Sequence, residues 1–261
     1  MGSELSLEEQ LRQACSKGES QVIQELLKQD DIDVNEKNSE GRGALDLACR
    51  FGHLECVQLL VKDKRVDVNQ PNHFGGTPFL ISCQEGHLDI VQYLYKQKVK
   101  LDGKNDAATP LFQACFRGHT EVVMFLMDKI DVNQKDARNC TPFFCACFYG
   151  HPEIVKLLLT SDTQVDLESK WKNNNLTALE QAKLHVQHDP FVYNWETEIE
   201  GQKRQKNCQE IVEIIKNFER DPTYYKFLWK KEFGILERIS SDLMAAIVLV
   251  SDDFFTLKIQ N

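Results

Sequence analysis

Apolar residues recur along the chain in short helical stretches that are separated by polar, turn-rich segments. In the stretch after each Gly-His pair, apolar side chains lie three and four residues apart, as in Leu54, Val57 and Leu60. This spacing places them on one face of an α-helix. The same pattern returns three times along the chain, at Leu88, Ile90, Val91 and Leu94, at Val122, Val123 and Leu126, and at Ile154, Val155 and Leu158. The pattern predicts an all-α fold whose helices each bury one face.

A shorter helix is predicted before each of these helices. Three of the shorter helices open with Thr followed by Pro, where the Thr hydroxyl can accept a backbone hydrogen bond and Pro fits the first helical position. Each ends at the Gly of a Gly-His pair, because Gly readily adopts the positive φ that closes a helix. The pairs recur every 32 to 34 residues, at Gly52-His53, Gly86-His87, Gly118-His119 and Gly150-His151. A fixed period of this length predicts a stack of helical hairpins.

The repeated unit resembles the ankyrin repeat family. The family opening Thr-Pro-Leu-His-x-Ala is approached by residues 109–114, Thr-Pro-Leu-Phe-Gln-Ala, and the linker Asp-Val-Asn-x-x-Asp by residues 131–136. The resemblance implies an ankyrin-repeat solenoid of about six helical hairpins over residues 5–219. The repeats are expected near 5–38, 39–72, 73–105, 106–137, 138–173 and 174–219.

The sixth repeat contains an insertion, and an apolar segment follows it. The second helix of this repeat is predicted at 208–215, which leaves an insertion near 187–207 that ends in a basic cluster, Lys203 to Lys206. We interpret the insertion as a surface loop or a lengthened helix, with a binding role as the alternative. Residues 220–261 are too apolar for a solvated linker, so we expect a helical C-terminal capping segment. A partner-binding or self-association helix is the alternative.

Charge and composition exclude several classes of function. The chain carries 40 acidic and 31 basic residues, a net charge of -9, which is unsuited to a nucleic-acid phosphate backbone. The longest strongly apolar run, 244–250, is far shorter than the roughly 20 residues of a membrane span. We expect no signal peptide and free, buried thiols, and therefore a cytoplasmic protein, with the nucleus as a further location. Five of the nine cysteines share one repeat position, namely Cys15, Cys49, Cys83, Cys115 and Cys147.

No catalytic machinery is recognisable in the sequence. It contains no phosphate-binding P-loop, no His-Glu-x-x-His zinc motif and no Gly-x-Ser-x-Gly nucleophile elbow. His185, His188 and Asp189 have helical spacing for a metal site, but no Cys or further His completes the set, so a solvated surface is favoured. We therefore predict no enzyme activity, no catalytic residue, no cofactor and no metal site.

A protein-binding surface remains as the candidate functional feature. In ankyrin-like stacks, the resemblance implies that partners contact the linker tips and the pair of residues before each Gly-His. These positions are rich in aromatic and Arg residues, which are enriched in binding hot spots. As an alternative, Phe51, Phe116 and Phe148 stack on each other and serve cohesion alone. The predicted partner-binding residues are Arg50, Phe51, His73, Phe74, Gln84, Glu85, Phe116, Arg117, Arg138, Phe148, Tyr149 and Trp171.

Two functional hypotheses follow. The first is a monomeric, non-enzymatic scaffold or adaptor that binds a partner protein on the concave face of the stack. The second is a regulatory or inhibitory subunit of an enzyme or assembly, which acts through the inserted loop and the C-terminal tail. The resemblance also implies that Asn35, Asn69 and Asn133, which follow Asp-Val in the linkers, are sites of hydroxylation.

Overall fold

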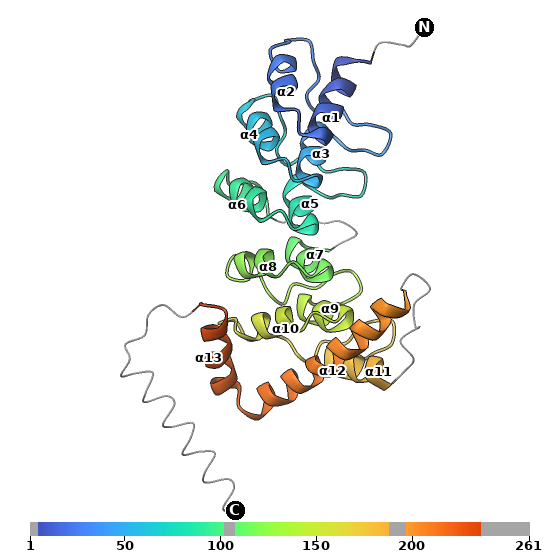
Figure 1. Cartoon of the computed structure of the whole chain (residues 1–261), viewed down its shortest axis with the longest axis vertical. Helices are drawn as coiled ribbons and strands as arrows, with labels where there is room; N and C mark the ends of the chain where they lie inside the picture. Colours follow the sequence, from blue (N-terminus) through green and yellow to red (C-terminus); the bar gives the residue numbers. More distant parts are fainter. Residues whose placement is uncertain (1–4, 102–107, 188–196, 236–261) are drawn as a thin grey trace, which may run out of the picture.

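The helices of this protein pair into hairpins that stack along one axis (Figure 1). The computed structural model describes residues 5–101, 108–187 and 197–235. The first helices of the pairs form one column, namely α1 (Leu7–Lys17), α3 (Ala44–Arg50), α5 (Pro78–Glu85), α7 (Pro110–Arg117), α9 (Pro142–Tyr149) and α11 (Ala178–Gln187). The second helices follow in α2 (Ser20–Leu26), α4 (Leu54–Lys62), α6 (Leu88–Lys96), α8 (Thr120–Leu126), α10 (Pro152–Leu159) and α12 (Glu198–Arg220), and α13 (Pro222–Glu232) ends the described chain. The prediction of an all-α repeat solenoid is confirmed.

The ends of the first helices are where the sequence places them. The hydroxyl of Thr141 accepts a hydrogen bond from the backbone N–H of Phe144 at 3.1 Å, and Pro142 occupies the first turn. α5 and α7 begin in the same way. Gly86, Gly118 and Gly150 close these helices in the left-handed conformation. Thr-Pro and Gly therefore set the length of the helix locally, before any packing.

Each Gly-His pair also joins one hairpin to the hairpin before it. The Nε2 atom of His119 lies 2.9 Å from the carbonyl oxygen of Gln84. Because a carbonyl can only accept, this nitrogen donates the hydrogen bond. The imidazole ring covers Gly86, where an added Cβ would come within 2.4 Å of the ring nitrogen Nδ1. His53, His87 and His151 make the equivalent bonds to Ser16, Arg50 and Phe116, so a ladder of histidines runs along the stack.

The core is a continuous apolar layer between the two helix columns. The stripe residues predicted in the second helices are its members, and Val57, Leu60 and Leu94 have no exposed surface. The nine cysteines are buried free thiols, as expected for a chain that uses them as small core residues. Burial raises the pKa of the Cys49 thiol to about 12.

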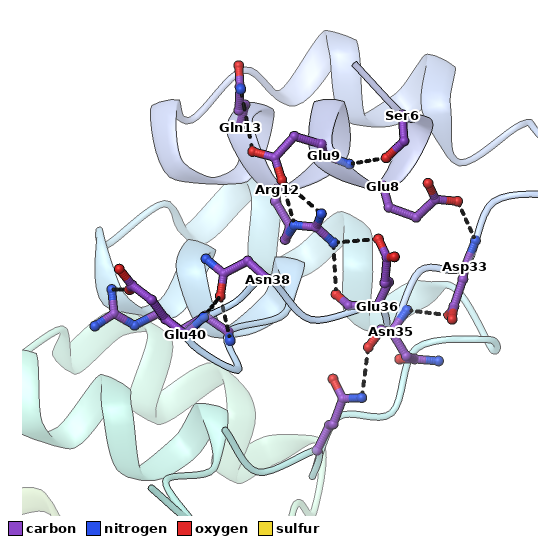
Figure 2. A network of polar contacts seen from close by, with 12 residues as sticks. Ser6, Glu8, Glu9, Arg12, Gln13, Asp33, Asn35, Glu36, Asn38 and Glu40 are labelled. Carbon is purple, nitrogen blue, oxygen red and sulfur yellow. Dashed lines mark hydrogen bonds and ion pairs between the residues drawn. The ribbon is translucent and has the colours of Figure 1, made fainter. Parts of the chain in front are cut away.

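The N-terminal hairpin is tied to the next linker by a polar network (Figure 2). The guanidinium of Arg12, which is 7% exposed, bonds Glu9 Oε2 and Glu36 Oε2, each at 2.8 Å. Arg12 also donates to the backbone oxygen of Glu36. The hydroxyl of Ser6 accepts from the N–H of Glu9 and begins α1. The first helix of the stack is thus held by charge-assisted hydrogen bonds on its polar side.

The sixth hairpin is built differently from the others. α12 is 23 residues long and begins at Glu198, so residues 198–207 of the predicted insertion are a lengthened helix. Thr197 and Glu200 form a capping box at its start. Among the described residues, α12 and not a further histidine covers Gly150. Asn207 of α12 donates to the carbonyl oxygen of Gly150 at 2.8 Å. Residues 188–196 of the predicted insertion lie outside the described residues.

α13 packs across the second-helix column near α10 and α12 (Figure 1). Trp229 is buried and its ring stacks on Phe218, with ring centroids 6.0 Å apart and 13° between the planes. Lys230 Nζ pairs with Asp162 Oδ1 at 2.7 Å. The aromatic residue Trp229, near the start of the predicted capping segment, is thus buried within the fold. Residues 236–261 lie outside the described part of the chain, and the role of 220–261 as a cap stays a prediction.

Candidate protein-binding surface

The two residues before each helix-ending Gly face in different directions. At the first position of the pair, Gln84 is 9% and Phe148 8% exposed. At the second position, Phe51 is 51% exposed and Arg117 is also exposed. Successive residues of an α-helix lie about 100° apart, so only one of the two can project fully from the stack. The sequence pattern gave no reason to distinguish the two positions.

Phe148 belongs to an aromatic cluster on the first-helix side of the stack. Its ring lies 4.9 Å from Tyr149, 5.4 Å from Trp171 and 5.1 Å from His185, measured between centroids. Tyr149 in turn contacts Phe116 edge-on at 4.5 Å. Phe148 is therefore a packing residue, as the alternative interpretation proposes, but its described ring contacts include Tyr149, Trp171 and His185 and neither Phe51 nor Phe116. Phe51 is exposed. Trp171, predicted at a linker tip, lies half-buried against this cluster.

The aromatic cluster surrounds a pocket of about 220 Å³, called here the aromatic pocket. Five rings form most of its wall, and side chains from the linker before α9 complete it. Arg138 is exposed at this linker and lines the pocket, as does Asp136. The lining residues are Phe112, Asp136, Arg138, Cys140, Phe144, Cys145, Phe148, Tyr149 and Trp171.

A second hollow of about 560 Å³, called here the α12 groove, lies beside the aromatic pocket. Its first wall comes from the ends of α7 and α9, and its second wall from the first turns of α12. Tyr149 lines both hollows. The α12 groove is lined by Phe116, Arg117, Tyr149, Gly150, His151, Glu200, Lys203, Arg204 and Asn207. The α12 residues were not predicted as binding residues, although the basic cluster from Lys203 was a signal for them.

The predicted residues of the N-terminal half form a different surface. Arg50 donates from Nη1 to Glu85 Oε1 at 2.9 Å, so these two charges neutralise each other. Phe74 is 56% exposed at a linker tip. His73 is exposed as well, and its ring lies where a Cβ on Gly41 would be. The predicted residues of the N-terminal half therefore include an ion pair and separate exposed rings. Those of the C-terminal half lie around two adjoining hollows.

Comparison with known families accounts for the repeats. The model for ankyrin repeats in three copies matches residues 8–72 and 64–136, and the model for a single ankyrin repeat matches 138–170. The chain belongs to the ankyrin repeat family. Ankyrin repeats are generally protein–protein interaction modules, so the hollows on the first-helix side lie on a module of that class. No curated protein matches the chain.

The linker asparagines of this ankyrin stack connect neighbouring repeats. Asn133 donates from Nδ2 to the backbone oxygen of Gln164 at 2.8 Å and accepts at Oδ1 from the N–H of Asp166. Asn35 bridges to the following linker in the same way, and Asn69 accepts from the N–H of Lys100. Hydroxylation of these asparagines stays a prediction.

His185 is part of the ankyrin core. It is 4% exposed, with Nε2 at 2.8 Å from the Gln181 amide and Nδ1 at 3.7 Å from Cys208 Sγ. The interpretation of His185 as a solvated surface residue is wrong, because α12 covers this face of α11. His188 and Asp189 lie outside the described residues. Among the described residues, no group of His, Cys, Asp or Glu is arranged to hold a metal ion, and no helix is long and apolar enough to cross a bilayer.

The burial of His185 predicts a loss of stability in mild acid. Burial, with a contribution from the Arg204 charge, lowers the pKa of His185 to about 4, whereas an unfolded His titrates near 6.5. Between these values the unfolded chain binds a proton that the folded chain does not, so the free energy of unfolding falls as pH decreases. We expect a loss of about 2 kcal/mol between pH 7 and pH 5 from this residue.

Urea unfolding at the two pH values, followed by circular dichroism, measures this loss. The variant His185→Gln keeps an amide where the imidazole lies and removes the titration, so its loss over the same interval should be smaller by that amount. An equal loss in the two proteins would contradict the assignment. Burial also lowers the pKa of His151, so the stability of the parent protein and of His185→Gln keeps a residual pH dependence.

Proposed function

We propose that this ankyrin stack is a non-enzymatic scaffold or adaptor that binds a partner protein on its first-helix face, at the aromatic pocket and the α12 groove. The observation that carries the proposal is that two hollows of about 220 and 560 Å³ adjoin at a single half-buried tyrosine, Tyr149. Interface hot spots are rich in aromatic and Arg residues that cluster near the centre of the interface, as these residues do around Tyr149. The remaining predicted residues, from Arg50 to Glu85, would form the outer part of the interface.

The rigidity of the stack supports the same function. Much of the walls comes from α7, α9 and α12, whose first turns are capped, and His151 of the histidine ladder bonds the end of α7. Little ordering entropy is therefore lost when a partner binds. A standard protein interface buries about 800 Å² on each partner, which is far more than one pocket offers. A partner that fills the hollows would therefore extend along the neighbouring first helices. We further propose a monomer that acts in the cytoplasm.

The variant Tyr149→Ala tests this function. Removal of an aromatic anchor between the two hollows is expected to weaken partner binding by roughly 30-fold, the effect of a hot-spot truncation. Partners are captured from native lysate with the full chain and quantified by mass spectrometry. The matched control is Met124→Ala, which truncates a 40% exposed apolar side chain on the second-helix column.

Two outcomes are informative. Proteins recovered by the parent and by Met124→Ala, but lost with a folded Tyr149→Ala, are the expected result. Recovery of the same proteins by all three chains would contradict the proposed binding face. Circular dichroism at the capture temperature confirms that each variant is folded.

Regulation of an enzyme or assembly through the inserted segment is a second candidate function. It is favoured by one observation, that α12 contributes Lys203, Arg204 and Asn207 to the wall of a binding hollow. Deleting residues 189–196 leaves Thr197 and the capping box of α12 in place. If partner binding survives this deletion while Tyr149→Ala abolishes it, residues 189–196 do not carry the function.

A further inference from the structure

We propose that the segment bound by this face is acidic, with a carboxylate in the α12 groove and a neighbouring apolar side chain in the aromatic pocket. This inference rests on the proposed function, because it describes the chemistry of the partner at the same two hollows. Two observations support it: the placement of charged residues around the hollows, and the volume of the aromatic pocket.

Four cations, Arg117, Arg138, Lys203 and Arg204, line the two hollows of a chain whose net charge is -9. Arg117 and Lys203 lie on opposite walls of the α12 groove, and Arg138 lines the aromatic pocket. Within residues 5–101, 108–187 and 197–235, none of Arg117, Arg138 and Lys203 forms an ion pair with a carboxylate. The guanidinium of Arg117 lies over the ring of Phe116, 5.2 Å from its centroid.

The two acidic residues that line the hollows are bonded to their own backbone neighbourhood. Asp136 Oδ1 accepts from the N–H groups of Arg138 and Cys140, at 2.9 and 2.7 Å. Glu200 Oε2 accepts from the backbone N–H and the hydroxyl of Thr197, at 2.9 and 2.7 Å. Hydrogen bonds within a turn and a helix cap therefore hold these carboxylates. The cations across the hollows remain able to form an ion pair with a carboxylate of the partner.

The N-terminal half of the stack shows the contrast. Arg50 is paired with Glu85, and Arg42 with Glu40, at 2.9 and 2.7 Å. Arg12 is held by Glu9 and Glu36. Three cations of the C-terminal hollows, Arg117, Arg138 and Lys203, form no such pair within the described residues, and charge complementarity selects an acidic partner there.

The size of the aromatic pocket suggests what lies next to the carboxylate. A volume of about 220 Å³ is smaller than the roughly 300–1,000 Å³ of a small-molecule site and suits one large side chain. Five aromatic rings favour an apolar or aromatic occupant. An ammonium group would also be attracted by the rings, but it would face the charge of Arg138. Because Tyr149 lines both hollows, the two hollows are adjacent. The apolar side chain and the carboxylate therefore belong to neighbouring residues of one partner segment.

Selection from a random peptide library against the full chain tests the inference. The expected result is enrichment of peptides in which Asp or Glu lies next to Phe, Tyr, Trp or Leu. The double variant Arg117→Glu/Lys203→Glu reverses two of the groove charges. Fluorescence anisotropy of the selected peptides should show binding to this variant that is about tenfold weaker or more. The matched control is Lys62→Glu/Lys96→Glu, which changes the net charge equally with exposed lysines of α4 and α6.

Each other result overturns the inference. Enriched peptides that are neutral or basic, a selection without binders, or equal weakening by the two double variants would show that the groove charges do not select the ligand. In any of these cases, loss of native partners with Tyr149→Ala would still support the proposed function. The two proposals therefore fail separately.

Discussion

Replacing Gly86 by Ala is expected to lower the free energy of unfolding by about 3 kcal/mol. Gly86 has a φ of +83°, a conformation that costs a residue with a Cβ about 1–2 kcal/mol. The new Cβ would also lie 2.4 Å from Nδ1 of His119, which forces the ring away from Gln84 and breaks its hydrogen bond, at about 1 kcal/mol. Urea unfolding followed by far-ultraviolet circular dichroism measures the change.

Two comparisons separate the backbone strain at Gly86 from the clash of the added Cβ with the His119 ring. Gly234 has a φ of +66°, and a Cβ added there would meet no neighbouring atom within 4 Å, so Gly234→Ala carries the backbone strain alone. In a double-mutant cycle, Gly86→Ala should cost less in a His119→Ala background, because the ring is gone. If the two single Gly variants lose equal stability, or if the cycle shows no coupling, the histidine ring is not the reason for Gly at this position.

Replacing Phe148 by Glu is expected to unfold the C-terminal repeats and to cost about 4 kcal/mol or more, because the variant loses the packing of a buried ring and places a carboxylate in an aromatic environment. The side chain is 8% exposed and packs against Tyr149, Trp171 and His185. Hydrogen exchange of the amides in α9 and α11, together with the circular dichroism of the whole chain, locates and measures the loss.

Phe51→Glu is the matched control for this variant. Phe51 also precedes a Gly-His pair, but it is 51% exposed, so its replacement should change stability by about 0.5 kcal/mol or less. Equal stability of the two variants would contradict the described burial of Phe148. A charge at Phe148 is consequently unsuitable as a test of binding alone, whereas Tyr149→Ala, Arg117→Glu and Lys203→Glu alter residues that line the hollows.

Much of the repeat geometry follows from local chemistry. Thr141-Pro142 begins α9 and Gly150 ends it, because a hydroxyl cap, a ring-fixed φ and a residue without Cβ act within one helical turn. The apolar spacing around Val57 and Leu60 predicts the buried face of α4 for the same reason. These interactions join residues that are near each other in the sequence, so their pattern is visible there.

The hollows depend on contacts between residues far apart in the chain. Asn207 lies 57 residues after Gly150 and bonds its carbonyl oxygen, which brings Lys203 and Arg204 to the groove wall. The sequence shows a basic cluster at this point but does not show which helix it faces. His185 illustrates the same difficulty, since its burial requires α12 to cover α11.

The amino-acid sequence therefore specifies an all-α ankyrin stack, its helix ends, its buried stripes and its cysteines as core residues. These properties repeat with a fixed period and depend on caps, turns and helical spacing. The direction of each residue before Gly-His, the covering of Gly by the next histidine, and the meeting of the aromatic pocket with the α12 groove at Tyr149 are properties of the folded chain. They arise where separate repeats pack together. The Gly-His pairs recur with a fixed period, but the sequence does not show which residue of another repeat each side chain contacts.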